Sequence, residues 1–226
     1  MTNLESFLSS PKTLTIANII LLTLVCILVF IVPIFPLPFH KILYNSLYSG
    51  IFLIAVIVLE KYWKTILSYA IILIFIEWFS SELEMNILAA LTKLLNILFF
   101  IMVVIFLIIQ IARTKKVTFL VIVQAISGYL LLGIVFAFLV ALIMIIQPEA
   151  YNFPAQDMNF SQNIAHLSDY VYYSFVTFTT LGYGDVVPQL PYSKSLAIFT
   201  SVTGQIYVAV IIAMLVGKFA SARAQN

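Results

Sequence analysis

Long apolar segments separated by short polar ones dominate the chain. Six segments are rich in aliphatic and aromatic residues and approach or exceed the roughly 20 residues that a helix needs to cross a membrane. They lie at residues 14–32, 42–59, 65–80, 87–112, 125–147 and 195–217. The third is the shortest. The pattern predicts an all-α membrane protein with six transmembrane helices.

The region around the fifth segment is longer than one crossing requires. Residues 117–147 would extend about 46 Å as a single helix at a rise of 1.5 Å per residue. Lys115 and Lys116 directly precede this region. We therefore expect its first turns to lie along the membrane surface as a linker helix between the fourth and fifth spans.

A polar stretch at residues 148–168 separates the fifth and sixth spans. It predicts an extracellular loop. Asp169 follows it and is suited to cap a short helix over residues 170–179, because a carboxylate accepts hydrogen bonds from the first N–H groups of a helix.

Composition and charge support the membrane assignment. Hydrophobic residues make up 63% of the chain, charged residues 9%, and the mean hydropathy is +1.14, whereas a soluble domain is about one-quarter charged. With a cytoplasmic N-terminus, eight of the eleven Lys and Arg residues fall on the cytoplasmic side, as the positive-inside rule requires. The eight are Lys12, Lys61, Lys64, Arg113, Lys115, Lys116, Lys218 and Arg223. We expect a multi-pass protein of the cell membrane with both termini in the cytoplasm.

The candidate chemistry lies at residues 180–185, which read Thr-Leu-Gly-Tyr-Gly-Asp between two apolar helices. This run resembles the selectivity filter of potassium channels. The resemblance implies that the backbone carbonyls of Thr180, Leu181, Gly182 and Tyr183 bind K⁺, with the Thr180 hydroxyl at the innermost site. Gly182 and Gly184 provide backbone angles that a Cβ would obstruct.

Residues before and after the filter complete the resemblance. Thr179 and Asp185 flank it. Tyr172 and Tyr173 occupy positions where the family carries aromatic residues around the filter, and one phenol is expected to reach Asp185 or Tyr183. Anchoring in the membrane interface is the alternative role for either ring. Val176 replaces a Glu that pairs with this Asp in some relatives.

The sixth span resembles the pore-lining inner helix. Gly204 lies where many such channels have a hinge glycine, and close helix packing is the alternative explanation. Gln205, Val208 and Ile212 are expected to face the water-filled cavity. Because the chain carries one filter segment, a fourfold carbonyl ring requires a homotetramer.

The resemblance divides the chain into residues 1–113, a four-helix domain with the layout of a voltage sensor, and residues 114–226, the pore domain. The fourth span holds Lys93 and no Arg, and Arg113 lies at its inner end. We therefore expect weak or absent voltage dependence. Glu77, the one acid within the third span, is a candidate partner for Lys93.

The sequence thus favours a potassium-selective channel subunit that conducts K⁺ passively. A non-conducting regulatory subunit or a potassium transporter subunit is the alternative. No nucleophile–base pair, phosphate-binding loop or metal-ligand cluster occurs in the sequence, so we expect that the protein is not an enzyme and binds no cofactor besides permeant K⁺. We expect membrane lipids around the helices and no nucleic-acid partner. Cys26 is expected to pack within a helix. His40 and His166 are expected to be surface residues of outer loops.

Overall fold

The computed structural model describes residues 10–59, 63–83, 86–114, 117–153 and 167–223. Within these ranges the chain is helical and carries no strand, only an isolated antiparallel bridge between Tyr151 and Pro188. The helices are α2 (Pro11–Cys26), η1 (Ile27–Ile31), η2 (Val32–Ile34), α3 (Leu37–Val58), α4 (Trp63–Leu83), α5 (Asn86–Arg113), α6 (Phe119–Ile146), η4 (Pro148–Ala150), α7 (Leu167–Phe178) and α8 (Pro191–Arg223).

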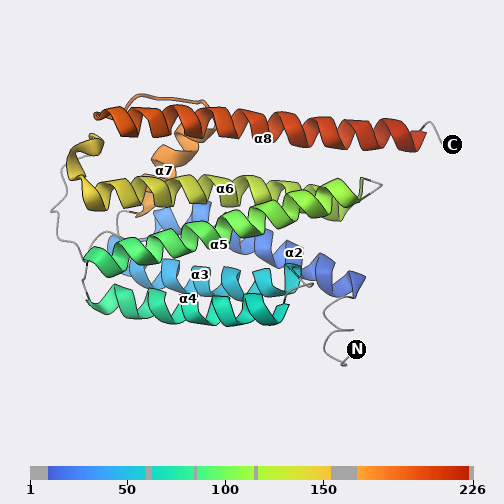
Figure 1. Ribbon diagram of the computed structural model, residues 1–226, viewed down its shortest axis with the longest axis horizontal. Helices are drawn as coiled ribbons and strands as arrows, with labels where there is room; N and C mark the ends of the chain where they lie inside the picture. The colour runs from blue at the N-terminus through green and yellow to red at the C-terminus, as the bar shows by residue number, and fades with distance from the viewer. Residues whose placement is uncertain (1–9, 60–62, 84–85, 115–116, 154–166, 224–226) are drawn as a thin grey trace.

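The long helices lie side by side along a common direction (Figure 1). α2 to α5 form a group on one side of α6, and α8 lies on its other side, with the short α7 contacting both α6 and α8. The most extensive contact between two helices is that of α5 with α6, which are joined by a short connection. The start of α2 and the end of α8 lie at the same end of the bundle.

Five helical segments are long and apolar enough to cross a membrane: Lys12–Ile34, Leu37–Val58, Leu91–Arg113, Phe119–Ile146 and Pro191–Ala220. They correspond to five of the six expected spans. The expected third span, 65–80, lies within α4, a helix of 21 residues, and its role as a sixth span stays a prediction. The structure therefore supports an all-α, multi-pass membrane protein with five candidate spans.

An aromatic cluster joins α3, α5 and α6. Tyr48 and Phe52 lie one turn apart on α3, as residues four apart on a helix do. The Phe52 ring lies edge-on to Phe99 with centroids 4.7 Å apart, and the Tyr48 ring lies 5.3 Å from Phe138 of α6. All four side chains are fully buried. Such pairs stabilise by about 0.5–1.5 kcal/mol each beyond the burial of their area, so the cluster fixes the four-helix group onto α6.

Among the described residues, no separate linker helix precedes the fifth span. α6 runs without a break from Phe119 to Ile146, and Thr118 before it is extended. Val121, Val123 and Gln124 are already buried in the first turns. Because these turns pack against the bundle and contain no Gly or Pro, nothing divides the helix into a surface segment and a span.

Asp169 is not the residue that caps α7. The helix begins at Leu167, so Asp169 lies within its first turn. A carboxylate there still interacts favourably with the helix dipole. The sequence pattern located the helix correctly and misplaced its start by a few residues.

His40 is buried, in contrast to the expected surface position. α3 begins at Leu37, which places His40 in its first turn, only 2% exposed. A ring nitrogen, Nε2, lies 2.8 Å from the Phe35 carbonyl oxygen, and the ring lies edge-on to Tyr44. Cys26 ends α2 and packs partly buried against the core, as expected. His166 and the side chain of Glu77 lie outside the described residues.

Candidate functional site

The chain reverses direction directly after α7. The Thr180 N–H donates to the Thr177 carbonyl oxygen at 2.9 Å. The Val176 carbonyl oxygen accepts from two N–H groups, those of Leu181 at 2.9 Å and Gly182 at 3.2 Å. The C-terminal turn of α7 therefore holds the start of the candidate filter through backbone hydrogen bonds.

The backbone of the candidate filter alternates in conformation. Thr180, Gly182 and Gly184 have φ angles of 60°, 59° and 79°, and they are the only described residues with positive φ. Such alternation turns successive carbonyl groups toward the same side of the chain. For Thr180, which has a Cβ, the left-handed conformation costs about 1–2 kcal/mol. Strain of this kind is concentrated at functional sites.

A hydrogen bond braces the residue after the filter. The Tyr172 hydroxyl donates to Oδ2 of Asp185 at 2.6 Å. This bond lowers the pKa of the Asp185 carboxyl group, because it stabilises the ionised form. The expectation that one of the two adjacent phenols reaches Asp185 is confirmed for Tyr172.

Tyr173 points elsewhere. Its ring is buried and packs against Tyr151 and Phe153, with centroids 5.0 Å and 6.0 Å away. It therefore contributes to an aromatic cluster beside α7 and is not brought to the filter residues. Thr179 donates its hydroxyl to the Phe175 carbonyl oxygen at 2.7 Å, which closes the last turn of α7.

The chain after the filter is tied to the segment that follows α6. The Val187 N–H donates to Oδ1 of Asn152, and the Asn152 N–H donates to the Val187 carbonyl oxygen at 3.2 Å. The Gln189 N–H donates to the Ala150 carbonyl oxygen at 2.9 Å. Sequence reasoning missed Asn152, because its partners lie more than thirty positions away and no local pattern marks it.

α6 supports the opposite side of α7. The Ser174 hydroxyl donates to the Gly133 carbonyl oxygen at 2.8 Å in a buried contact. A Cβ at Gly133 would collide with the Phe175 ring, so this glycine permits the close approach of the two helices. Phe178 is fully buried, with its ring 4.7 Å from that of Tyr129. These supporting residues were also missed by the sequence analysis.

α8 contacts the filter from the other side. Ser201 donates to the Thr177 carbonyl oxygen at 2.9 Å, and Nε2 of Gln205 donates to Oγ1 of Thr180 at 3.3 Å. Gln205 therefore lies next to the innermost candidate filter residue. A Cβ at Gly204 would collide with the carbonyl oxygen of Phe178.

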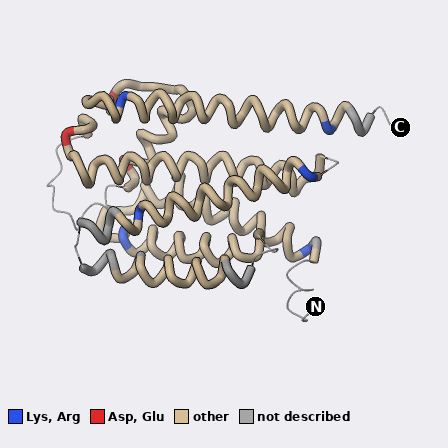
Figure 2. The backbone as a smooth tube through the Cα atoms, viewed as in Figure 1, with Lys and Arg blue, Asp and Glu red and all other residues tan. Residues whose placement is uncertain are grey.

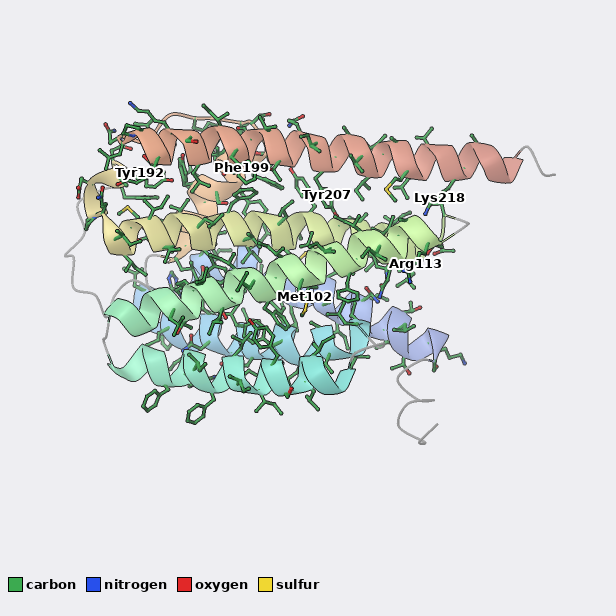
Figure 3. The ribbon with its side chains drawn as sticks, in the orientation of Figure 1. Met102, Arg113, Tyr192, Phe199, Tyr207 and Lys218 are labelled. Atoms are coloured by element: carbon green, nitrogen blue, oxygen red, sulfur yellow. The ribbon has the colours of Figure 1, made fainter. Side chains whose placement is uncertain are left out.

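Gly204 thus serves close packing in this structure, and α8 is a continuous helix through it. Its hinge role stays a prediction. Farther along, the α8 face meets α6 through Tyr207, whose hydroxyl donates to the Ala125 carbonyl oxygen at 2.9 Å (Figure 3).

Several expected filter and cavity side chains are exposed in the single chain. Leu181 is 57% exposed and Tyr183 66%, so neither packs behind the filter within one chain. Val208 and Ile212 on α8 are also exposed. Clusters of exposed apolar side chains mark a surface that another molecule or the membrane covers.

Comparison with known families places this site in context. Residues 129–221, which extend from within α6 through α7 and the filter segment into α8, match the family model described as ion channel. No curated protein and no solved structure matches the chain. The helices and this match together support an integral, multi-pass membrane protein with a region similar to ion channels, and they support passive conduction of ions.

Proposed function

We propose that the protein is the pore-forming subunit of a tetrameric, potassium-selective channel. The observation that carries this proposal is the alternating positive φ of Thr180, Gly182 and Gly184 within Thr-Leu-Gly-Tyr-Gly-Asp. A K⁺ ion loses its water only where oxygen dipoles replace it, and a run of carbonyl groups facing one axis provides them. The carbonyls of Thr180 to Tyr183 are the proposed ligands.

The surroundings of the filter suit a cation. α7 ends at Phe178, directly before the filter, so the negative end of its dipole lies near the innermost site. The Gln205 amide beside Thr180 adds a polar group at that level. Asp185, with its lowered pKa, adds a negative charge at the opposite end of the filter.

Four copies of the chain complete the pore in this proposal. One chain supplies one filter strand, and a carbonyl ring needs four. The exposed Leu181 and Tyr183 side chains would then pack against neighbouring subunits behind the filter. α5 packs directly on α6 of the same chain, and a short connection joins the two helices. Each subunit therefore carries its four-helix domain beside its own pore domain.

Weak voltage dependence follows from the charges of α5. Lys93 is buried, with Nζ 5.4 Å from the centre of the Phe138 ring, and Arg113 lies in the last turn. Each charge that crosses a potential of 100 mV contributes about 2.3 kcal/mol. One membrane-depth charge per α5 gives about four per tetramer, compared with the dozen or so that a steep sensor moves.

The test is a comparison of K⁺ and Na⁺ flux in liposomes that contain the purified protein. We expect K⁺-selective flux, and loss of selectivity or of conduction in Gly182→Ala, because a Cβ strains a position with φ of 59°. Gly217→Ala on α8 is the control, since its Cβ would meet no atom within 4 Å. Unchanged selectivity in Gly182→Ala would refute the filter assignment. Absence of flux from an intact tetramer would favour a non-conducting assembly.

A further inference from the structure

The C-terminal end of α8 is bonded to the C-terminal end of α5. Nζ of Lys218 donates to the carbonyl oxygens of Ile111 and Ala112 in the last turn of α5, near the labelled Arg113 (Figure 3). The last four carbonyl groups of a helix lack partners within it and carry a partial negative charge, which a nearby cation stabilises. The contact therefore joins α8 directly to the four-helix group.

The charges around this contact leave the α5 carbonyl groups as the partners of Lys218. Among the described charged positions, the end of the bundle where α8 finishes carries Lys and Arg, and the Asp and Glu positions lie toward the other end (Figure 2). The partial negative charge at the end of α5 is thus the attraction that holds the ammonium group in place.

Lys218 ends a stripe of inward-facing positions along α8. Tyr207 and Ile211 are buried, and Lys218 is partly buried on the same side of the helix. Tyr207 and Lys218 lie about 16 Å apart along the helix axis at 1.5 Å per residue. This side of α8 therefore has two anchors, the bond of Tyr207 to the Ala125 carbonyl oxygen of α6 and the bond of Lys218 to α5.

Toward the filter from Lys218, α8 packs only loosely on α5. An apolar cavity of about 270 Å³ lies there, and its lining comes from α5, α6 and α8. Ile105 and Ile108 of α5 and Ile206 and Val210 of α8 belong to that lining. Because side chains do not fill this space, the distance between the end of α8 and α5 depends on the Lys218 contact.

The other side of α8 carries exposed apolar side chains. Ile212 and Val216 are both exposed in the single chain. They lie about 120° and 160° around the helix from Lys218 at 3.6 residues per turn. In the proposed pore they face the axis and the same residues of the other three copies. A narrow ring of apolar side chains stops ions because water leaves it.

We propose that Lys218 is a latch that keeps this end of the pore open. α5 belongs to the group of helices on the far side of α6 from α8, whereas the proposed axis lies on the exposed side of α8 (Figure 1). The bond to α5 therefore draws the end of α8 away from the axis. When the bond breaks, the four ends approach one another, and the ring of Ile212 and Val216 narrows.

This inference rests on the proposed tetrameric pore and adds a means of regulating it. The latch gives the four-helix group control over the width of the pore through one contact, independently of voltage-sensing charges. Any change in the four-helix group that moves the last turn of α5 moves the acceptors of Lys218 with it.

Distances between spin labels across the tetramer test the latch. The label is attached at Phe219→Cys, an exposed position, in a full-length chain whose single cysteine is replaced by Cys26→Ser. A swing of α8 by about 10° about Tyr207 moves its end by about 3 Å, so the distance between opposite labels should shorten by about 6 Å in Lys218→Gln.

Two variants serve as controls for this measurement. Lys218→Arg keeps a cation that can donate to the same carbonyl groups, and it should keep the wild-type label distance. Lys12→Gln removes an exposed charge of α2 at the same end of the bundle and should also leave the distance unchanged. Shortening in Lys12→Gln as large as in Lys218→Gln would show a general effect of charge and overturn the latch.

Single-channel recording in planar bilayers gives a second measurement. The ratio of open to closed time should fall about fivefold in Lys218→Gln, since a hydrogen bond to a charged group shifts an equilibrium by roughly tenfold or more and Lys218 is only partly buried. K⁺ selectivity should not change, because Lys218 takes no part in the filter contacts.

The outcomes separate the latch from the pore itself. Label distances in Lys218→Gln that stay the same or lengthen in an intact tetramer, or an open-to-closed ratio that stays the same or rises, would overturn the latch and leave the proposed pore standing. Absence of any defined distance between labels would overturn the tetrameric pore and the latch with it.

Discussion

Replacement of Gly204 by Ala tests whether this glycine serves packing or motion. A Cβ at Gly204 would collide with the Phe178 carbonyl oxygen and lie 3.0 Å from Cδ2 of the Phe178 ring. The obstacle is backbone, which cannot rotate away as a flexible side chain can. α8 would therefore have to move away from the end of α7, and with it from Thr180.

The magnitude follows from a comparison with Gly217→Ala on the same helix. Both substitutions gain helix propensity of about 1 kcal/mol, since Gly is that much less favourable than Ala in a helix interior. A Cβ at Gly217 meets no atom within 4 Å, so only Gly204→Ala is overpacked. Overpacking of this kind costs about 1–3 kcal/mol. The difference in the free energy of unfolding between the two variants should therefore be about 1–3 kcal/mol.

The assay is thermal unfolding of each purified variant in the same detergent, with K⁺ selectivity measured in parallel. For a chain of this size, the expected difference corresponds to Gly204→Ala melting roughly 2–12 °C below Gly217→Ala. Selectivity should also fall in Gly204→Ala, because the shift reaches the filter through Phe178. If Gly204→Ala melts at or above Gly217→Ala and only its gating changes, the packing argument is wrong and the hinge role is favoured.

Three further substitutions test the supports of the filter. Tyr172→Phe removes the hydrogen bond that lowers the pKa of the Asp185 carboxyl group, so this pKa should rise in the variant. The contribution of the ionised carboxylate is lost as the pH falls through its folded-state pKa, and acid inhibition of the current should therefore begin at a higher external pH in the variant than in the wild type. An unchanged pH profile would contradict this. Ser174→Ala removes the hydrogen bond to the Gly133 carbonyl oxygen and should lower the free energy of unfolding by about 1 kcal/mol. Thermal melting measures this, and an unchanged melting temperature would contradict the prediction. Gly133→Ala should destabilise through collision with the Phe175 ring, and Phe175→Leu in the same chain should recover part of the loss; absence of recovery would locate the cause elsewhere.

Patterns of neighbouring residues account for what could be predicted. The run at residues 180–185 identifies a candidate filter because its chemistry depends on consecutive backbone positions and on two glycines. The structure shows the positive φ at Gly182 and Gly184 and adds Thr180, whose strain no sequence pattern indicates. The reach of Tyr172 to Asp185 was also predictable, since the resemblance supplied the relative position of the two residues.

Contacts between distant segments account for the failures. His40 resembles a loop residue in sequence, but it lies in the first turn of α3, and the packing of the fold buries it. The continuous α6 replaces the expected surface linker because its first turns pack against the bundle.

The sequence by itself determined that the chain is an apolar, helical membrane protein with one filter-like segment, because hydrophobicity and backbone conformation at glycine are local properties. Only the tertiary structure decided which residues hold that segment in place. Gly133, Ser174 and Asn152 act through partners more than thirty positions away. Such contacts depend on how the helices pack in space, which the order of residues along the chain does not display.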